Sequence, residues 1–391
     1  MKILLSISSL ALGGAQTFLV RLADNLVNNN FVCIYDYEVC DSRGIDNVLS
    51  LIPDQVEVVR LPRFFDFLGK KINYFLHFLG ISFNVWLWIK ELHLKFILSK
   101  YNIEIINSHL YHSDAFISSC LKTSEIPFVI TDHGDYRYVL NKGITTAAKV
   151  KEICNRANKI VCISDNNLQL MQELVTSKDK CTKIYNGISF IEKTFPKDAR
   201  KKLGISEDTF VFGMVARGIP EKGWETAITA FKSLAYVNNI YLILVGSSEY
   251  LNKLESECKT EKNIYFVGHA SEPFYWIDAF DVGLLPTYFA GESLPNSIIE
   301  YLILGKPTIA TAIGGIPEML KFQNRQSGLT IKLNDSHNVD VLELAKAMEL
   351  YFENRSLLME HSKNAILNSK RFNISLCAAS YEALFNKLIN L

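Results

Sequence analysis

The chain of 391 residues carries no net charge, because 41 lysine and arginine residues balance 41 aspartate and glutamate residues. The balance weakens any function that depends on whole-chain charge, such as duplex DNA binding, and we expect no nucleic-acid partner. Glycine and proline are sparse, at 20 and 10 residues, and repeats and low-complexity tracts are absent, which disfavours fibrous and disordered classes. The composition instead indicates a globular protein of two or three domains.

Several short motifs are also missing. No C-x-x-C pair occurs among the eight cysteines, and this thin spread is typical of reduced, buried thiols in a cytoplasmic protein rather than of disulfides or a zinc site. The dinucleotide fingerprint G-x-G-x-x-G, the Walker phosphate loop and the G-x-S-x-G hydrolase motif do not occur.

The first residues permit two interpretations. The apolar run after Met1 and Lys2 resembles a short secretory signal with a small-residue site near Gly13. The alternative is a buried strand over Lys2–Ile7, followed by a helix that begins near Gly14. We favour the strand, because serines interrupt the run and an amphipathic helical pattern follows at once.

Short apolar runs then alternate with helical patterns, as in doubly wound parallel sheets. Strands are predicted at Lys2–Ile7, Phe31–Tyr37, Glu57–Arg60, Ile103–Asn107, Phe128–Thr131, Lys159–Ile163 and Thr182–Tyr185, and then at Phe210–Val215, Tyr241–Val245, Ile264–Val267, Val282–Leu285, Thr308–Ala310 and Gly328–Ile331. Among the predicted helices are residues 224–235, 294–304, 339–352 and 376–389.

A polar stretch, residues 192–198, separates the two halves of this pattern. We predict two similar Rossmann-like α/β domains, an N-terminal acceptor domain over 1–190 and a C-terminal donor domain over 191–372. They are expected to face a cleft, since ligands bind at the carboxyl ends of parallel strands. The final helix, within 373–391, is predicted to cross back onto the first domain.

Residues 60–100 depart from the pattern, with ten aromatic residues and seven basic residues against two acidic ones. A membrane-spanning helix over 72–89 is rejected because polar residues and a glycine interrupt it. Two interpretations stay open. The segment forms a basic, aromatic surface in a lipid interface, or its aromatic residues pack helices onto the sheet.

Two charged pairs in the second half suit a sugar nucleotide. Arg217 and Lys222 flank a tight turn between a strand and a helix, so both cations can converge on a diphosphate. Glu292 precedes a predicted helix and Glu300 lies one to two turns inside it, so both carboxylates can face one pocket and accept hydrogen bonds from sugar or ribose hydroxyls. For each pair, solvated surface charges are the alternative.

Two glycine pairs each follow a predicted strand. They are Gly13-Gly14 in the first half and Gly314-Gly315 in the second. Glycine lets backbone N–H groups approach a ligand closely, so both loops are candidate ligand contacts.

Together these elements resemble the retaining GT-B glycosyltransferases of glycosyltransferase family 4, also called group 1. The resemblance covers nearly the whole chain and rests on the Arg217/Lys222 loop, the glutamates at 292 and 300, and residues 314–318. The stretches 185–188 (YNGI) and 131–134 (TDHG) also resemble family motifs. At Ser293-Leu294 the chain departs from the Gly-Phe that is frequent in the family, which affects the expected shape of the sugar pocket.

The resemblance implies roles for the matching residues. Arg217 and Lys222 hold the donor diphosphate, Glu300 binds the ribose, and Glu292 contacts the transferred sugar. His133 lies beside the sugar and the reacting centre. The implied catalytic residues are His133, Arg217, Lys222 and Glu292, and the implied donor-binding residues are Gly13, Gly14, Arg217, Lys222, Glu292, Asn296, Ser297 and Glu300.

Histidines and aspartates near the ends of two strands (His109, His112, Asp114, Asp132, His133 and Asp135) invite a metal-site interpretation. His109 and His112 are spaced for one helical face, but they lie where a strand ends, and the aspartates share no period. We favour loop residues that line the acceptor side. We expect no metal and no further cofactor, because cations and backbone donors can stabilise the leaving diphosphate.

We therefore predict a cytoplasmic enzyme that moves a sugar, with retention of configuration, from a nucleotide-diphosphate donor to a hydroxyl group. The expected donor is a UDP-sugar, and the expected acceptor is a glycan or lipid-linked glycan in surface polysaccharide synthesis. Residues 60–100 are the candidate for peripheral contact with the inner face of the cell membrane. The alternatives are a GT-B sugar-nucleotide epimerase and a catalytically silent subunit that binds nucleotide-sugar.

Overall fold

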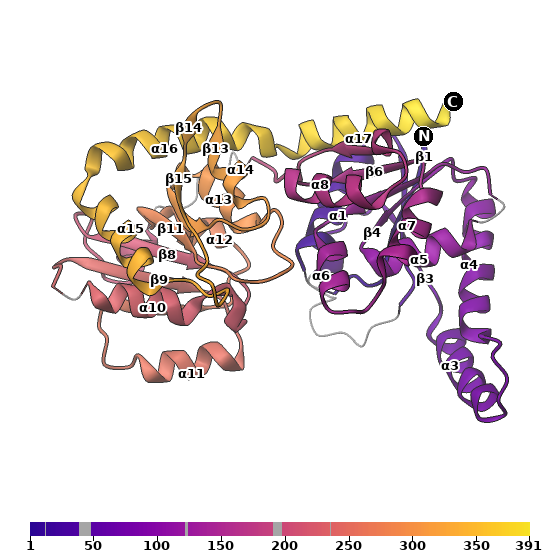
Figure 1. Cartoon of the computed structure of the whole chain (residues 1–391), viewed down its shortest axis with the longest axis horizontal. Helices are drawn as coiled ribbons and strands as arrows, with labels where there is room; N and C mark the ends of the chain where they lie inside the picture. Colours follow the sequence, from indigo (N-terminus) through magenta and orange to yellow (C-terminus); the bar gives the residue numbers. More distant parts are fainter. Residues whose placement is uncertain (12, 39–47, 122–123, 191–197, 235) are drawn as a thin grey trace. The chain divides into compact units, whose positions relative to one another are not determined.

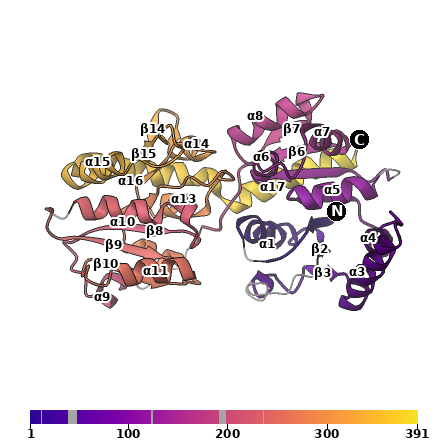
Figure 2. The ribbon, with the colours of Figure 1, turned by 60° about the horizontal axis from the view of Figure 1, so that its bottom comes forward.

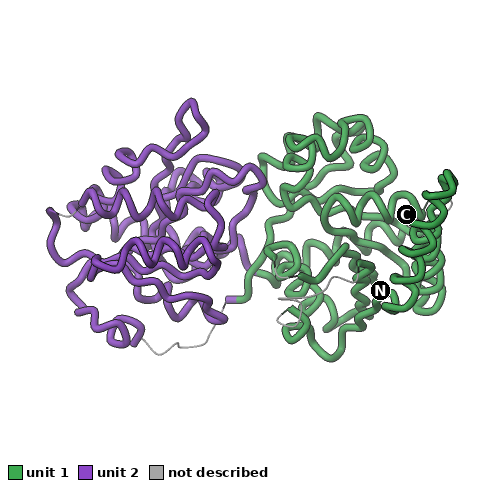
Figure 3. The backbone as a smooth tube through the Cα atoms, turned by 90° about the horizontal axis from the view of Figure 1, so that it is seen from below, with its two compact units in different colours: residues 1–189, 374–391 green, residues 190–373 purple. Residues whose placement is uncertain are grey.

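The computed structural model describes residues 1–11, 13–38, 48–121, 124–190, 198–234 and 236–391. The chain forms two compact units, each built on one parallel sheet (Figures 1 and 3). Unit 1 comprises residues 1–189 and 374–391, and unit 2 comprises residues 190–373. Cys40 and the polar stretch predicted to separate the halves, apart from Asp198, lie outside the described residues.

Unit 1 contains a seven-stranded sheet in the order β3-β2-β1-β4-β5-β6-β7, with all neighbours parallel. Its interior strand β1, between β2 and β4, is almost wholly buried, as expected for an apolar run covered on both faces. The strands are β1 (Lys2–Ile7), β2 (Phe31–Asp36), β3 (Glu57–Arg60), β4 (Ile105–His109), β5 (Phe128–Asp132), β6 (Lys159–Cys162) and β7 (Cys181–Lys183).

Helices cover the sheet of unit 1 and close two apolar cores. The last helix packs beside the first, and the hydroxyl groups of Tyr381 and Thr131 lie 3.1 Å apart. The helices are α1 (Gly14–Leu26), α3 (Arg63–Phe78), α4 (Val85–Tyr101), α5 (Tyr111–Cys120), α6 (Asp135–Asn141), α7 (Ala147–Arg156), α8 (Asp165–Leu174), the 3-10 turn η1 (Lys178–Lys180) and α17 (Ile374–Ile389).

Unit 2 contains a six-stranded parallel sheet in the order β10-β9-β8-β11-β12-β15 and a short hairpin, β13-β14. The strands are β8 (Phe210–Val215), β9 (Ile240–Val245), β10 (Ile264–Gly268), β11 (Val282–Leu285), β12 (Thr308–Thr311), β13 (Lys321–Phe322), β14 (Arg325–Gln326) and β15 (Gly328–Ile331). The helices are α9 (Ala199–Lys202), η2 (Pro220–Lys222), α10 (Trp224–Ser233), α11 (Glu249–Glu257), α12 (Pro273–Asp278), α13 (Asn296–Ile303), α14 (Ile316–Leu320), α15 (Val341–Glu353), α16 (Arg355–Ser369) and η3 (Lys370–Phe372).

All thirteen strands of the two parallel sheets were expected, but β4 begins two residues later than predicted. The cause is the end of α4, where Asn102 adopts a left-handed conformation and the amide of Ile103 still donates to Leu98. Residues 102 and 103 therefore complete the helix cap and do not start the strand. Strand β7, at Cys181–Lys183, begins one residue earlier and ends two residues earlier than predicted.

The aromatic segment forms a hairpin of α3 and α4 that projects from the sheet of unit 1 (Figures 1 and 2). The hypothesis that its aromatic residues pack helices onto the sheet is wrong for α3, since Phe64, Phe67, Phe75 and Phe78 are exposed. Helix α3 packs against α4, and its polar and small side chains form that contact. Within the described residues, no helix has the length and apolar character needed to cross a membrane.

Candidate functional site

Three loops of unit 2 leave neighbouring strands at the same edge of the sheet. They follow β8, β11 and β12, and they carry the charged pairs and the Gly314-Gly315 turn identified in the sequence. Parallel strands all end at one edge, so residues far apart in sequence meet there.

The centre of this loop cluster is an ion pair between Lys222 and Glu292. Lys222 Nζ lies 2.5 Å from Glu292 Oε2, and the two side chains are only 9% and 8% exposed. A charged pair with so little water around it is strongly coupled, and removing one partner leaves an uncompensated charge. The pair therefore holds the loop after β8 to the loop after β11.

Phe289 brings both predicted cations together. The guanidinium carbon of Arg217 lies 5.3 Å from the centre of the Phe289 ring, and Lys222 Nζ lies 5.2 Å from it. Arg217 is exposed, whereas Lys222 is buried. The expected convergence of these cations is thus present, but Phe289 had no motif of its own that could identify it.

Hydrogen bonds to backbone atoms fix these loops. The indole nitrogen of Trp224 donates to the carbonyl of Arg217 over 2.9 Å, and the amide of Tyr288 donates to the carbonyl of Glu221 over 2.8 Å. The hydroxyl of Thr311, at the end of β12, donates to the carbonyl of Thr287 over 2.5 Å. All three loops are therefore connected through main-chain atoms.

Gly314 fits where no other residue fits without strain. Its φ is +55°, and a Cβ added there would lie 2.1 Å from the carbonyl oxygen of Glu292. The amide of the neighbouring Gly315 donates to the carbonyl of Ser293 over 2.7 Å. The glycine turn thus sets the position of the backbone that carries Glu292.

The remaining donor-binding candidates lie on α13. Asn296 and Ser297 are the first two residues of this helix and are half-buried, and Glu300 is buried in its second turn. The next residue, Tyr301, accepts a hydrogen bond from the amide of Val215 over 2.7 Å, which ties α13 to the end of β8. Of the two glutamates, Glu292 contacts Lys222 from the loop after β11, and Glu300 is buried on α13.

The predicted residues of unit 1 lie around Phe18. Gly13 caps α1, Gly14 is its first residue, and Phe18 follows in the next turn. The ring of Phe18 lies 5.4 Å from the ring of His133, which directly follows β5. The structure therefore places the Gly13-Gly14 turn and His133 in one neighbourhood.

His133 lies between two polar side chains. Its Nε2 is 2.9 Å from Nδ1 of His109, and its Nδ1 is 3.5 Å from Nδ2 of Asn186. Burial lowers the pKa of His133 to about 3, and burial next to His133 lowers the pKa of His109 well below its usual range. Both imidazoles are therefore neutral and serve as hydrogen-bonding groups.

Asp114 and Asp132 accept hydrogen bonds from neighbouring groups of unit 1. Asp132 Oδ1 accepts from the amide of Gly134 and its Oδ2 accepts from Asn167, while Asp114 accepts from Ser108 and Tyr136. Burial raises the pKa of Asp132 to about 7 and that of Asp114 well above its usual range.

The expectation that these residues lie in loops is wrong for several of them. His109 ends β4, His112 and Asp114 lie on α5, and Asp132 ends β5. The side chains of His109, Asp114 and Asp132 are fully buried, whereas that of His112 is exposed. Among the described residues, no group of three or more histidine, cysteine, aspartate or glutamate side chains is arranged to hold a metal ion.

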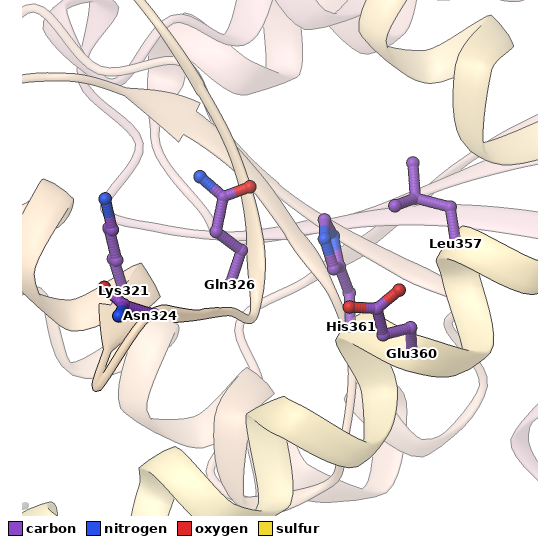
Figure 4. A pocket seen from close by; sticks show the side chains of 6 residues that line it. All are labelled: Lys321, Asn324, Gln326, Leu357, Glu360 and His361. Atoms are coloured by element: carbon purple, nitrogen blue, oxygen red, sulfur yellow. The ribbon is translucent and has the colours of Figure 1, made fainter.

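A separate pocket of unit 2, of about 330 Å³, lies between the β13-β14 hairpin and α16 (Figure 4). It is lined by Lys321, Asn324, Gln326, Leu357, Glu360 and His361. None of the predicted site residues contributes to it. His361 is instead held by Tyr351, whose hydroxyl lies 2.6 Å from its Nδ1.

Comparison with known proteins agrees with this geometry. The profile of Glycosyltransferase Family 4 matches residues 12–190, and the profile of Glycosyl transferases group 1 matches residues 196–370. The chain is 26% identical over 299 residues to the O-antigen biosynthesis glycosyltransferase WclY of Escherichia coli, covering 73% of this chain and 79% of that protein. It is 27% identical over 256 residues to the UDP-Gal:alpha-D-GlcNAc-diphosphoundecaprenol alpha-1,3-galactosyltransferase of Escherichia coli, covering 61% of this chain and 65% of that protein.

A solved structure shows the same architecture. The structure of Anabaena Alr3699/HepE in complex with UDP and glucose matches 99% of this chain and 100% of its own, with a TM-score of 0.74 at 20% identity. The two doubly wound parallel sheets are those of a GT-B protein. The chain belongs to the group 1 glycosyltransferases of family 4, and it is a glycosyltransferase.

Proposed function

We propose that this enzyme transfers a sugar from a UDP-sugar to a hydroxyl of a glycan or lipid-linked glycan, in surface polysaccharide synthesis, and retains the anomeric configuration. One observation carries the proposal. Three loops of unit 2 meet at Lys222, Glu292 and Gly314, where cations, a carboxylate and a glycine turn lie together.

Unit 2 has the groups that a nucleotide-diphosphate sugar requires. Arg217 and Lys222 would face the diphosphate, and the first amides of α13, at Asn296 and Ser297, have no partner within the helix and suit an anion. Glu300 would accept hydrogen bonds from the ribose and Glu292 from the transferred sugar. UDP is the proposed nucleotide because the Anabaena structure holds UDP and the name of the Escherichia coli galactosyltransferase specifies a UDP-sugar.

The reaction breaks the bond between the anomeric carbon and the diphosphate oxygen and forms a bond from that carbon to the acceptor oxygen. Negative charge grows on the diphosphate as it leaves, and the proton of the acceptor hydroxyl passes to the departing diphosphate oxygen. Arg217 and Lys222 would stabilise the departing anion, as fixed cations do when charge develops in the transition state. We propose that neither a metal ion nor another cofactor is needed for this step.

Unit 1 would supply neutral hydrogen-bonding groups. His133 is uncharged at physiological pH, so it can contact a sugar hydroxyl without adding charge to the site. The backbone of Gly13-Gly14 would lie against the diphosphate or the sugar. His109 and Asn186 would position the imidazole of His133.

The proposed acceptor places the enzyme in the cytoplasm, next to the inner face of the cell membrane. The name of the galactosyltransferase relative specifies a diphosphoundecaprenol-linked acceptor, and the name of WclY specifies O-antigen biosynthesis. A lipid-linked acceptor lies at a membrane surface, and we propose peripheral contact with that surface through residues 60–100.

The test is incubation of the purified protein with a panel of nucleotide-sugars, with and without lipid-linked glycans, using Lys222→Ala as the control for contaminating activity. Slow release of UDP without acceptor, and a glycoside of unchanged anomeric configuration by NMR with acceptor, are expected. Epimerised or free sugar as the sole product, at a rate no acceptor alters, would identify an epimerase. Binding without any turnover would identify a silent subunit.

A further inference from the structure

Helix α3 is amphipathic, and its apolar side faces solvent. Residues 64, 67, 68, 71, 74, 75 and 78 share one face at helical spacing, and six of these seven are aromatic residues or leucine. They are all exposed, with Phe64 at 67% and both Tyr74 and Phe78 at 81%. A helix in a globular protein normally buries such a face in the core. Because this face is exposed, it is a candidate contact surface for a partner or a membrane.

The opposite side of α3 is polar and is locked to α4. Asp66 accepts from the indole nitrogen of Trp86 over 2.8 Å, and Asn73 donates to Asn84 over 2.6 Å. The helices approach so closely at Gly69 that an added Cβ would lie 3.1 Å from the Cα of Trp86. These contacts prevent α3 from rotating to bury its apolar face.

The hairpin is also anchored to the sheet. Lys90 of α4 is buried, with its Nζ 3.3 Å from the centre of the Trp86 ring and 5.0 Å from that of Tyr37, which follows β2. Burial lowers the pKa of Lys90 to about 8. These contacts fix the orientation of the hairpin within unit 1.

Exposed apolar side chains continue around the turn and onto α4. Leu79, Ile81 and Phe83 of the turn are exposed, as are Leu87, Trp88, Leu92 and Phe96 of α4 (the two helices lie side by side in Figure 2). A protein partner covers one face of a helix pair, whereas here the apolar residues extend over both helices and the turn. An apolar medium suits this distribution better than a single docking surface.

Basic residues accompany the rings. Residues 60–100 have a net charge of +5 in a chain that is neutral overall. Within the described part of the chain, Arg63 and Lys71 form no ion pair, and the Lys71 ammonium lies 4.4 Å from the centre of the Phe67 ring. A cation beside an exposed ring can reach lipid phosphates while the ring enters the interface.

We propose that the α3-α4 hairpin docks unit 1 on an anionic bilayer, with the outward face of α3 and the turn at 79–84 lying in the lipid interface. The inference deepens the membrane contact of the proposed function and names the element and the lipid chemistry. The biological role of the docking rests on the proposed function, but the binding to a bilayer itself requires neither donor nor acceptor.

The test is flotation of the full-length protein with vesicles of phosphatidylcholine, with or without 30% phosphatidylglycerol. Wild type should float with the anionic vesicles and be released by salt. Tryptophan fluorescence should shift to the blue and be quenched by brominated lipid, because the Trp88 ring is exposed on the hairpin.

Two double variants separate the apolar and charged contributions. Phe75→Ser/Phe78→Ser should weaken vesicle binding on the order of 100-fold, because the variant lacks two aromatic rings whose transfer from water to the lipid interface favours binding. Arg63→Glu/Lys71→Glu should weaken binding to anionic vesicles at least about 30-fold, at roughly 1 kcal/mol for each basic residue lost. Lys90 is left unchanged because it is buried.

Matched controls lie in unit 2. Leu342→Ser/Met359→Ser removes two exposed apolar side chains, and Lys259→Glu/Lys262→Glu makes the same change in net charge on exposed residues. Both should float like wild type. All variants should keep the wild-type circular dichroism spectrum and the wild-type rate of donor hydrolysis in solution.

Three outcomes would overturn the proposal. The first is that wild type does not float with anionic vesicles at low salt. The second is that the control variants lose as much flotation as the hairpin variants. The third is a concentration-dependent dimer of wild type that Phe75→Ser/Phe78→Ser makes monomeric, which would assign the surface to a second copy of the chain. Vesicle binding without donor hydrolysis would instead refute the proposed function and leave the docking inference intact.

Discussion

Replacing Gly314 by alanine tests whether the glycine turn sets the position of Glu292. Two effects are expected. An alanine at φ +55° pays the cost of a left-handed conformation, roughly 1–2 kcal/mol. Its Cβ also meets the carbonyl oxygen of Glu292 at 2.1 Å, where real Cβ contacts are at least 3.0 Å, so the two loops must separate by about 1 Å.

Gly204→Ala is the matched control. Gly204 has φ +68°, nothing within 4 Å of an added Cβ, and a place in unit 2 just before β8, at the amino end of the sheet. The control therefore pays the same conformational cost without displacing any loop. Both variants should lower the melting temperature by about 2–8 °C.

Their activities should differ. A displacement of about 1 Å at a reacting centre costs about 100-fold in rate, so Gly314→Ala should lose that much donor turnover while Gly204→Ala stays within about threefold of wild type. Initial rates of UDP release, with the melting temperature measured on the same samples, give both quantities. If both variants keep equal activity, the Gly314 turn does not position the catalytic loop, and our account of this site is wrong.

Three further predictions concern the charges of the two units. Arg217→Ala and Lys222→Ala should each reduce turnover by about 100- to 1,000-fold, because developing negative charge loses a fixed cation; folded variants within a few-fold of wild type would exclude the diphosphate role. The fold should be unchanged in Arg217→Ala, whereas Lys222→Ala leaves Glu292 as an uncompensated buried charge and should also lower the melting temperature. Saturating EDTA should leave activity nearly unchanged, since these cations and backbone amides stabilise the leaving group, and a loss that Mn²⁺ or Mg²⁺ restores would contradict this mechanism. Burial lowers the pKa of His133 to about 3 and that of His109 well below its usual range, so folding opposes the proton uptake that the unfolded chain shows below about pH 6.5. The stability that these histidines contribute is present above pH 6.5 and is lost as pH falls toward 3, by up to about 1.4 kcal/mol per pH unit for each histidine. The free energy of unfolding in urea should therefore fall less steeply with decreasing pH in His109→Gln than in wild type. Parallel plots of this free energy against pH would refute the assignment.

Much of the fold followed from the sequence because parallel sheets have a strong local signal. Buried strands read as short apolar runs between helical patterns, and these runs occur at all thirteen strand positions. The predicted start of a strand was wrong where a helix cap occupies its first residues, as at Asn102 before β4. The charged and glycine motifs were visible for the same reason, since each is contiguous in the chain.

Only the tertiary structure decided which of these residues meet. Phe289 has no motif, yet both Arg217 and Lys222 lie beside its ring, and the position of Glu292 depends on Gly314 from the next loop. His109 was visible as a histidine at a strand end, but its pairing with His133 depends on the neighbouring register of β4 and β5.

The aromatic hairpin shows the same division. Composition alone determined that residues 60–100 are aromatic and basic, and left open whether their rings face protein or lipid. Whether the aromatic face of α3 is exposed depends on which side of α3 packs against α4, and only the tertiary structure decides this. Asp66, Gly69 and Asn73 form that contact, and the rings are therefore left outside.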